Sequence, residues 1–319
     1  MKRLWLIALV LWSMLPYESL AQGWSDVVDP APGPPRAVGT YTAGCVQGAV
    51  ALPPEGSGFQ TMRRYRRRFF GHPTLIRYLQ ELAEAATKQR LGILSIGDLG
   101  QARGGPSPSG HASHQTGLDV DIRFSLLPNG PPLLAAERET ISAISMVMAN
   151  GRTLDITQWS PQHAQLLRLA AGFEAVERIF VNPVIKQALC QQSPGAPWLR
   201  KLRPWWGHDD HFHVRLRCPH GDTECQVQEP IPSGDGCGAD LAWWFTEEAR
   251  KKGVTGTVIL RAILGSDGKV HAVVSIRRLR YGLTQKAIQA ARGIRFVPAT
   301  AHDESVSQWI RIEYNFNVY

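Results

Sequence analysis

Two segments far apart in the chain combine strand-like alternation with clustered histidines. In residues 110–122, apolar residues at 118, 120 and 122 alternate with Asp119 and Asp121. In residues 207–216, apolar residues at 212, 214 and 216 alternate with His211, His213 and Arg215. This period of two is typical of a half-buried strand, whose alternate side chains share a face. Half of the ten histidines lie in these two segments, and that clustering indicates a metal site.

If the two strands pair, His114, Asp121 and His213 can meet at one point. Two imidazoles and one carboxylate, with a fourth position left to water, form a usual catalytic zinc arrangement. Zinc would lower the pKa of its water to about 7 and polarise a carbonyl group. His211, next to a ligand but not itself bound, would then act as a general base or hold the tetrahedral oxygen. For any one histidine alone, the alternative is a structural or surface role.

Further motifs accompany these segments, at residues 58–62, 180–187, 215–219 and 233–238. Together with the His-x(6)-Asp and His-x-His spacings, they make residues 24–245 similar to the penicillin-insensitive murein endopeptidases, a family of periplasmic zinc peptidases. The resemblance implies that His114, Asp121 and His213 bind zinc and that His211 is catalytic. His111 and His208 match family histidines near the metal, so we assign His111 to the metal and His208 to catalysis. The bond that the family cuts is the D-alanyl–meso-diaminopimelyl amide, which joins two peptidoglycan stem peptides.

The same resemblance predicts how the five cysteines pair. It joins Cys218 to Cys225 and Cys190 to Cys237. In the family, a cysteine at the position of Cys45 pairs with one near the C-terminus. This chain has no cysteine there, so Cys45 is predicted to be odd, as a free thiol or a route to dimerisation.

The first 21 residues read as a secretory signal peptide. A basic start at residues 1–3 precedes an apolar run over residues 4–15, and small residues lie at 19–21. The run is too short for a confident membrane span, which needs about 20 residues, although an uncleaved anchor is an alternative. We expect an exported protein with no membrane span after cleavage, and cysteines that form disulfides.

The chain is basic, with a net charge of +8 and a pI near 9.4. The sharpest basic feature is the run Arg63–Arg68, which contains five arginines and one tyrosine. No nucleic-acid motif accompanies it, so we expect no nucleic-acid partner. The anionic wall peptides of peptidoglycan are one candidate partner for the run, and a solvated face is the other reading.

Between these motifs the sequence predicts helices, a strand and a loop. Helical spacing of apolar residues covers 75–88 and 163–176, a strand is predicted at 91–99, and the Gly-Pro-rich loop 100–110 should line the cleft. His72, His163 and His220 are isolated, and we interpret them as structural. Trp198, Trp205 and Trp206 could form the wall of a peptide groove or pack in a core.

From residue 248 the pattern changes to β-β-α-β. Strands are predicted at 254–264, 269–276 and 306–316, and a helix at 283–292. Short motifs at 267–270, 287–291 and 295–299 make this part similar to the TonB C-terminal domain family. The chain lacks the membrane span and long proline-rich linker of TonB, so we do not expect energy transduction. A protein-docking, wall-docking or self-associating role is expected, and an appended domain that only adds stability is the alternative.

The sequence therefore predicts an α+β protein. An antiparallel-sheet zinc peptidase domain with flanking helices would occupy residues 22–247, and the β-β-α-β domain residues 248–319. We expect a periplasmic zinc metallo-endopeptidase that hydrolyses peptidoglycan cross-links and that β-lactams do not acylate, because no serine nucleophile is needed. The alternatives are a zinc D,D-carboxypeptidase and a non-catalytic wall-binding adaptor.

Overall fold

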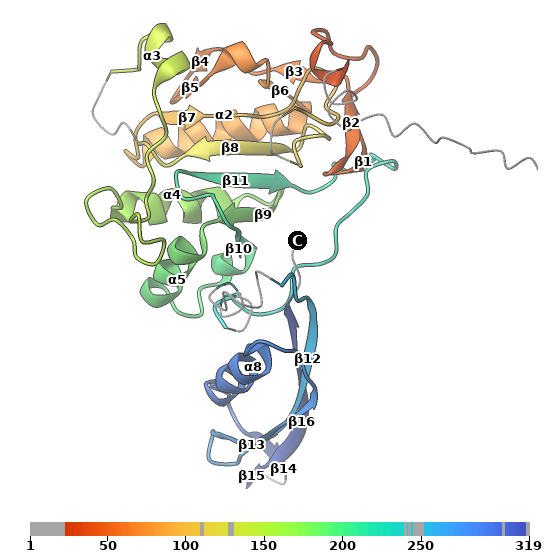
Figure 1. Cartoon of the computed structure of the whole chain (residues 1–319), viewed down its shortest axis with the longest axis vertical. Coiled ribbons are helices and arrows are strands. Elements are labelled where there is room, and N and C mark those ends of the chain that lie inside the picture. The colour runs from red at the N-terminus through yellow and green to blue at the C-terminus, as the bar shows by residue number, and fades with distance from the viewer. Residues whose placement is uncertain are drawn as a thin grey trace, which may run out of the picture.

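The computed structural model describes residues 23–108, 112–126, 131–238, 241, 244, 252–301 and 304–316 (Figure 1). The predicted signal peptide lies outside these residues, as does the chain around position 248. The domain boundary drawn at residue 247 therefore stays a prediction. Within the described ranges, no helix has the length and apolar character needed to cross a membrane.

A seven-stranded mixed sheet is the centre of the larger part of the chain (Figure 1). Antiparallel pairing joins its four inner strands, and two pairs near the edges are parallel. Each parallel pair is separated in sequence by a helix, the connection that parallel strands require. The α+β class is confirmed, with a sheet that is mixed rather than wholly antiparallel. In spatial order the strands are β10 (Leu202–Pro204), β9 (Val176–Val181), β11 (His211–Leu216), β8 (Asp119–Arg123), β7 (Leu94–Ile96), β5 (Phe59–Thr61) and β4 (Glu55–Gly56).

Helices α2 (Pro73–Lys88) and α4 (Pro161–Gly172) pack against the apolar side of this sheet. In α2, the buried Leu75, Leu79 and Leu82 recur every three or four residues, which places them on one helix face. They share a core with Val120 and Val214 of the two central strands. Because the helices cover the apolar faces of β8 and β11, the polar side chains of these strands point to the opposite side.

The predicted helix at 75–88 is confirmed, whereas α4 ends earlier than predicted. Phe173 is extended, at φ −71° and ψ 136°, and β9 begins at Val176. His72 and His163 both have structural roles. The His72 ring accepts a hydrogen bond from the Thr74 amide at the start of α2 (3.2 Å). The His163 ring lies 2.9 Å from the Ser160 amide at the start of α4 and 2.9 Å from the Phe124 carbonyl oxygen.

Shorter elements complete the larger part. β1 (Arg36–Thr40) and β2 (Ala43–Gln47) form an antiparallel hairpin, and β3 (Val50–Ala51) pairs with β6 (Phe70–Gly71). The Tyr41 hydroxyl, at the tip of the hairpin, donates to the Leu216 carbonyl oxygen at 2.7 Å and ties it to β11. The remaining short helices are η1 (Arg64–Arg66), α3 (Ala135–Thr140), α5 (Pro183–Gln192) and η2 (Pro197–Lys201).

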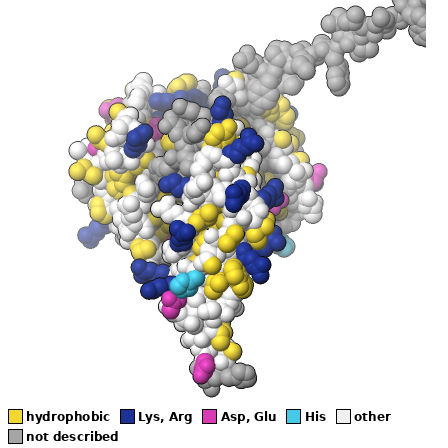
Figure 2. Space-filling model, turned by 60° about the horizontal axis from the view of Figure 1, so that its bottom comes forward, with side chains coloured by type: hydrophobic (Ala, Val, Ile, Leu, Met, Phe, Trp, Pro, Cys, Tyr) yellow, Lys and Arg dark blue, Asp and Glu magenta, His cyan; other side chains and the backbone are white. Residues whose placement is uncertain are grey.

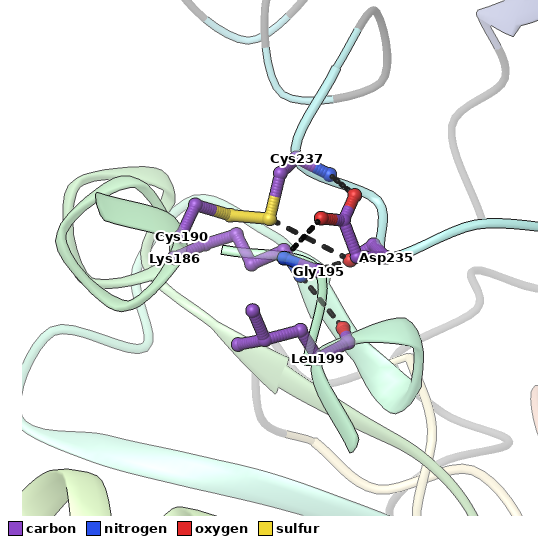
Figure 3. Close-up of a disulfide and its surroundings, with 6 residues drawn as sticks. All are labelled: Lys186, Cys190, Gly195, Leu199, Asp235 and Cys237. Atoms are coloured by element: carbon purple, nitrogen blue, oxygen red, sulfur yellow. Dashed lines mark hydrogen bonds between the residues drawn. A yellow bond between two sulfur atoms is a disulfide. The ribbon is translucent and has the colours of Figure 1, made fainter. Parts of the chain in front are cut away.

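Both predicted disulfides are present, Cys190–Cys237 and Cys218–Cys225, and Cys45 is a free thiol. The first bridge fastens the segment after β11 to α5 (Figure 3). Beside it, the buried Lys186 ammonium donates to the carbonyl oxygens of Leu199 (2.6 Å) and Asp235 (2.7 Å). A disulfide and a buried cation therefore hold the same loop in place.

The C-terminal part is a three-stranded antiparallel sheet with one helix against it. The sheet order is β13 (Val270–Arg277), β12 (Gly256–Leu264), β16 (Gln308–Phe316), and the helix is α8 (Leu283–Arg292). A small hairpin that the sequence did not predict, β14 (Ala299–Ala301) and β15 (Glu304–Val306), separates α8 from β16. Residues 252–316 contain ten Lys or Arg against four Asp or Glu, so this part holds most of the chain's net positive charge of +8. Figure 2, viewed with this end forward, shows basic side chains spread over that surface.

Aromatic contacts join the two parts. Trp244 is buried in the C-terminal core with Val258 and Phe316. Its ring also lies 5.7 Å from that of Trp205 and 6.0 Å from that of Trp206, between centroids. Of the two readings of these tryptophans, core packing is the one observed, since Trp205 and Trp206 pack against the C-terminal core and Trp198 against the larger one.

Candidate metal centre and active site

The polar faces of β8 and β11 meet in three successive cross-strand pairs. Asp119 lies opposite Arg215, Asp121 opposite His213, and Arg123 opposite His211. Directly opposite residues in an antiparallel pair have Cβ atoms about 4.5–5.5 Å apart, and successive pairs on one face are about 6.7 Å apart along the strand. The alternation seen in the sequence therefore builds a row of six charged or titratable side chains.

The middle pair and His114 bring three donor atoms together. His114 Nε2 and His213 Nδ1 each lie 3.4 Å from Asp121 Oδ1. His114, Asp121 and His213 are all buried, and they could hold a metal ion because one ligand atom from each lies within 4.8 Å of the others. Asp121 Oδ1 is buried and has no hydrogen-bond partner among the described residues. An orphaned carboxylate oxygen between two imidazoles fits a cation such as zinc, which binds nitrogen and oxygen ligands.

Asp119 fixes both histidines from the first pair. Its Oδ1 accepts from His213 Nε2 (2.9 Å) and Arg215 Nε (2.7 Å), and its Oδ2 accepts from the His114 backbone amide (3.1 Å). The bond to His213 Nε2 leaves the Nδ1 lone pair facing Asp121. His114 has a positive φ of 69°, an uncommon conformation that the bond to Asp119 supports. Asp119 is thus a hydrogen-bonding neighbour of both candidate ligands, and such partners orient a ligand and set its tautomer.

Charge in the metal-free site is divided among these groups. Burial works against protonation of His114, but the Asp121 carboxylate outweighs it and raises the pKa of His114 to about 9. Burial lowers the pKa of His213 to about 4 despite the nearby Asp119. Although burial opposes ionisation, His114 and His211 hold the pKa of Asp121 well below its usual range. The site thus pairs an anionic Asp121 with a cationic His114, and a metal cation would take the place of that proton.

His211 lies next to the three donors without joining them. Its Nε2 is 3.7 Å from Asp121 Oδ1, and its Nδ1 bonds to Asp210. Burial opposes the charged ring, but the carboxylates of Asp121 and Asp210 raise the pKa of His211. His211 can therefore hold a proton at the mouth of the site.

His208 lies behind His211 rather than at the donors. The two ring centroids are 4.9 Å apart, and His208 Nδ1 bonds to the Trp206 carbonyl oxygen at 3.0 Å. Burial, together with the charges of His211 and His213, lowers the pKa of His208 to about 3, so its ring is neutral. His111 falls outside the described residues, and its assignment to the metal stays a prediction.

Comparisons with known proteins match the chain to one family. Residues 37–259 match the family model described as penicillin-insensitive murein endopeptidase. The chain belongs to this family. A penicillin-insensitive murein endopeptidase of Klebsiella pneumoniae is 45% identical over 239 residues, covering 75% of this chain and 86% of the relative. One from Salmonella paratyphi C is 43% identical over 252 residues, covering 78% and 90%. Residues 245–318 match the C-terminal domain of Gram-negative bacterial TonB proteins.

Two residues of the site in this member of the murein endopeptidase family were not predicted from the sequence. Arg123 continues the alternation of Asp119 and Asp121 by one step, so the pattern that predicted Asp121 as a ligand also contained Arg123. Asp98 binds Arg66 (3.3 Å) and Arg68 (3.0 Å) from the arginine run and lines one cavity with Asp121. It had no signal in the sequence, because only the fold brings β7 and its following loop beside β8. Part of the predicted cleft loop does reach the site, since Gln101 and Gly105 line a small cavity with His114.

Proposed function

We propose that this protein is a zinc-dependent endopeptidase of the periplasm that hydrolyses peptide cross-links of peptidoglycan. The observation that carries the proposal is the meeting of His114, Asp121 and His213 in a buried cluster, with His211 beside it. Family membership supports the reaction class, because the relatives are named murein endopeptidases. By the same likeness, the bond is the D-alanyl–meso-diaminopimelyl amide.

Each residue of the site has its own role in the proposed hydrolysis. His114, Asp121 and His213 would hold zinc, which supplies a Lewis acid and a nucleophile at neutral pH. Asp119 keeps His213 Nδ1 and His114 directed at that point. His211 takes a proton at Nε2 from the attacking water and returns it to the leaving amine, and Asp210 stabilises the charged ring in between. His208 stays neutral and packs against His211, which fixes the plane of that ring.

The chemistry needs no serine nucleophile, so β-lactams have nothing to acylate in this mechanism. For localisation, the signal-like start of the chain and the peptidoglycan substrate both support the periplasm. We also propose that residues 22–247 form the peptidase domain and residues 248–319 the TonB-like domain, which docks another protein, the wall or a second copy.

The test is digestion of purified cross-linked muropeptide dimers, followed by mass analysis. We expect conversion of each dimer to two monomers, loss of the reaction with a zinc chelator and recovery with added zinc. His114→Ala and Asp121→Ala should abolish the reaction in folded protein, and the exposed His220→Ala should not. Full activity of the two site variants would refute the ligand assignment. Release of D-alanine from monomeric pentapeptide, with dimers left intact, would identify a carboxypeptidase. Intact dimers that still bind the protein would identify an adaptor.

A further inference from the structure

A cavity of about 270 Å³ opens beside the candidate metal centre, between the arginine run and the end of β8. Asp121 and His211 form its inner wall, and the other charged residues that line it are Arg63, Arg66, Arg123, Asp98 and Asp210. The volume far exceeds the roughly 30 Å³ that one water occupies in the liquid. The cavity is therefore a second compartment of the site, continuous with the residues proposed to bind metal and carry protons.

The three aspartates that line this compartment, Asp98, Asp121 and Asp210, are engaged with groups other than Arg63 and Arg123. Asp98 accepts from both Arg66 and Arg68, so one carboxylate serves two guanidinium groups. Asp210 bonds to His211, and Asp121 faces the histidines of the metal centre. For Arg63, the structure records no ion pair with any described residue.

Of the three arginines, Arg123 gives the strongest indication of an anionic ligand. It is only 7% exposed, yet its recorded bond is to a neutral group, the Ile141 carbonyl oxygen at 3.0 Å, and no described carboxylate lies within 4 Å. A buried cation without an anion is costly, and guanidinium groups bind carboxylates with two parallel hydrogen bonds. An anionic group of the substrate would complete this compartment.

We propose that Arg63, Arg66 and Arg123 form a subsite for a free carboxylate on the carbon that bears the scissile amide nitrogen. The side of the bond follows from His211, which lines the compartment and lies opposite Arg123 across the two strands. His211 returns its proton to the leaving nitrogen, so the fragment that extends past His211 into the compartment is the amine fragment. The choice of the amine side of the bond rests on the proposed function. The subsite adds a site of substrate specificity to that function.

The test compares two forms of one ligand. The probes are a muropeptide monomer with a free carboxylate next to the amine, and the same monomer with that carboxylate as a primary amide. Binding to the zinc-loaded protein is measured by calorimetry, and kcat/KM is measured on dimers with and without the same amide. Since hydrogen bonds to charged groups contribute about 1.5–3 kcal/mol, we expect the wild type to prefer the carboxylate form about 10- to 100-fold.

Arg63→Gln carries the main test, and Arg67→Gln is its matched control. Arg63 and Arg67 flank η1, with positive φ angles of 52° and 54°, but only Arg63 lines the compartment. Arg63→Gln should remove most of the preference by weakening the carboxylate form alone, and Arg67→Gln should leave it unchanged. Arg123→Gln, checked for folding by urea denaturation, should act like Arg63→Gln.

The outcomes separate the two proposals. The subsite would be overturned if Arg63→Gln weakened binding of the carboxylate probe and the amide probe equally, or if the wild type showed no preference between them. Either result would do so even in a protein that cleaves dimers. A carboxylate preference in binding that Arg63→Gln removes, in a protein that cleaves no dimer, would support the subsite and refute the endopeptidase function.

Discussion

Asp119→Asn tests whether the metal centre depends on a residue that does not bind the metal. The carboxylate accepts from the His213 ring, the Arg215 side chain and the His114 amide, and it is fully buried. An amide has one acceptor oxygen, and its NH2 group would face a donor. Arg215, only 3% exposed, would then lose its counter-charge.

Two separate losses follow from this geometry. Leaving a buried charge without its partner costs about 3–5 kcal/mol, and this loss should appear in the metal-free protein. Removing the partner of a ligating histidine lowers metal affinity about 10- to 100-fold, which corresponds to about 1.4–2.7 kcal/mol. That second loss should appear only in the stabilisation that zinc adds, because a ligand stabilises the folded state according to its affinity.

The assay is urea denaturation of the metal-free and zinc-loaded proteins, with zinc affinity measured by competition with a chelator. Asp155→Asn, at an exposed carboxylate bonded to Thr157, is the control and should keep the wild-type zinc affinity. Unchanged zinc affinity in Asp119→Asn would refute the orienting role. A loss of zinc affinity without any loss in the metal-free protein would show instead that Asp119 acts on the metal directly.

Three further predictions concern stability. Cys190→Ser should lower the free energy of unfolding by about 4 kcal/mol and Cys218→Ser by about 2.5, because their bridges span 47 and 7 residues; equal losses in urea denaturation would contradict this ranking. Burial lowers the pKa of His163 from 6.5, so the unfolded chain binds the extra proton first and stability falls as pH drops below about 6.5. His163→Gln should reduce that fall between about pH 7 and 5, and an unchanged pH slope would count against it. Trp244→Ala should cost about 3–5 kcal/mol and split one calorimetric transition into two, whereas a single retained transition would show that Trp244 does not couple the two cores.

The strand pattern was sufficient to place Asp121 and His213 on one face of the sheet. A shift of one residue in the pairing register of β8 and β11 would turn their apolar side chains away from the helices. The hydrophobic pattern therefore restricts which residues can face each other. The helix over 283–292 followed from its apolar spacing in the same way.

Other features depend on contacts between distant residues and had no local signal. The positive φ of His114 is supported by the hydrogen bond that its amide donates to Asp119, and a glycine or asparagine would have been the usual sign of such a conformation. The end of α4 was misplaced because the apolar residues Phe173, Ala175 and Val176 continue the helical spacing past Gly172. The contact of Trp205 with Trp244 arises only when the C-terminal part folds back on the first. The arginine run could be counted in the sequence, but only the fold shows that Arg63 and Arg66 face the metal centre and Arg67 does not.

The three cross-strand pairs of β8 and β11 give each task its own place along the strands. The Asp119–Arg215 pair holds the framework, the Asp121–His213 pair would bind the metal, and the Arg123–His211 pair would contact the substrate. Because successive pairs are two residues, or about 6.7 Å, apart along the strand, a substitution at Arg123 can change which peptide is accepted while the other two pairs keep their contacts. Substitutions in the third pair, by natural selection or by design, could therefore change the specificity of the enzyme toward peptidoglycan with amidated stem peptides. The residues of the reactive centre would stay the same.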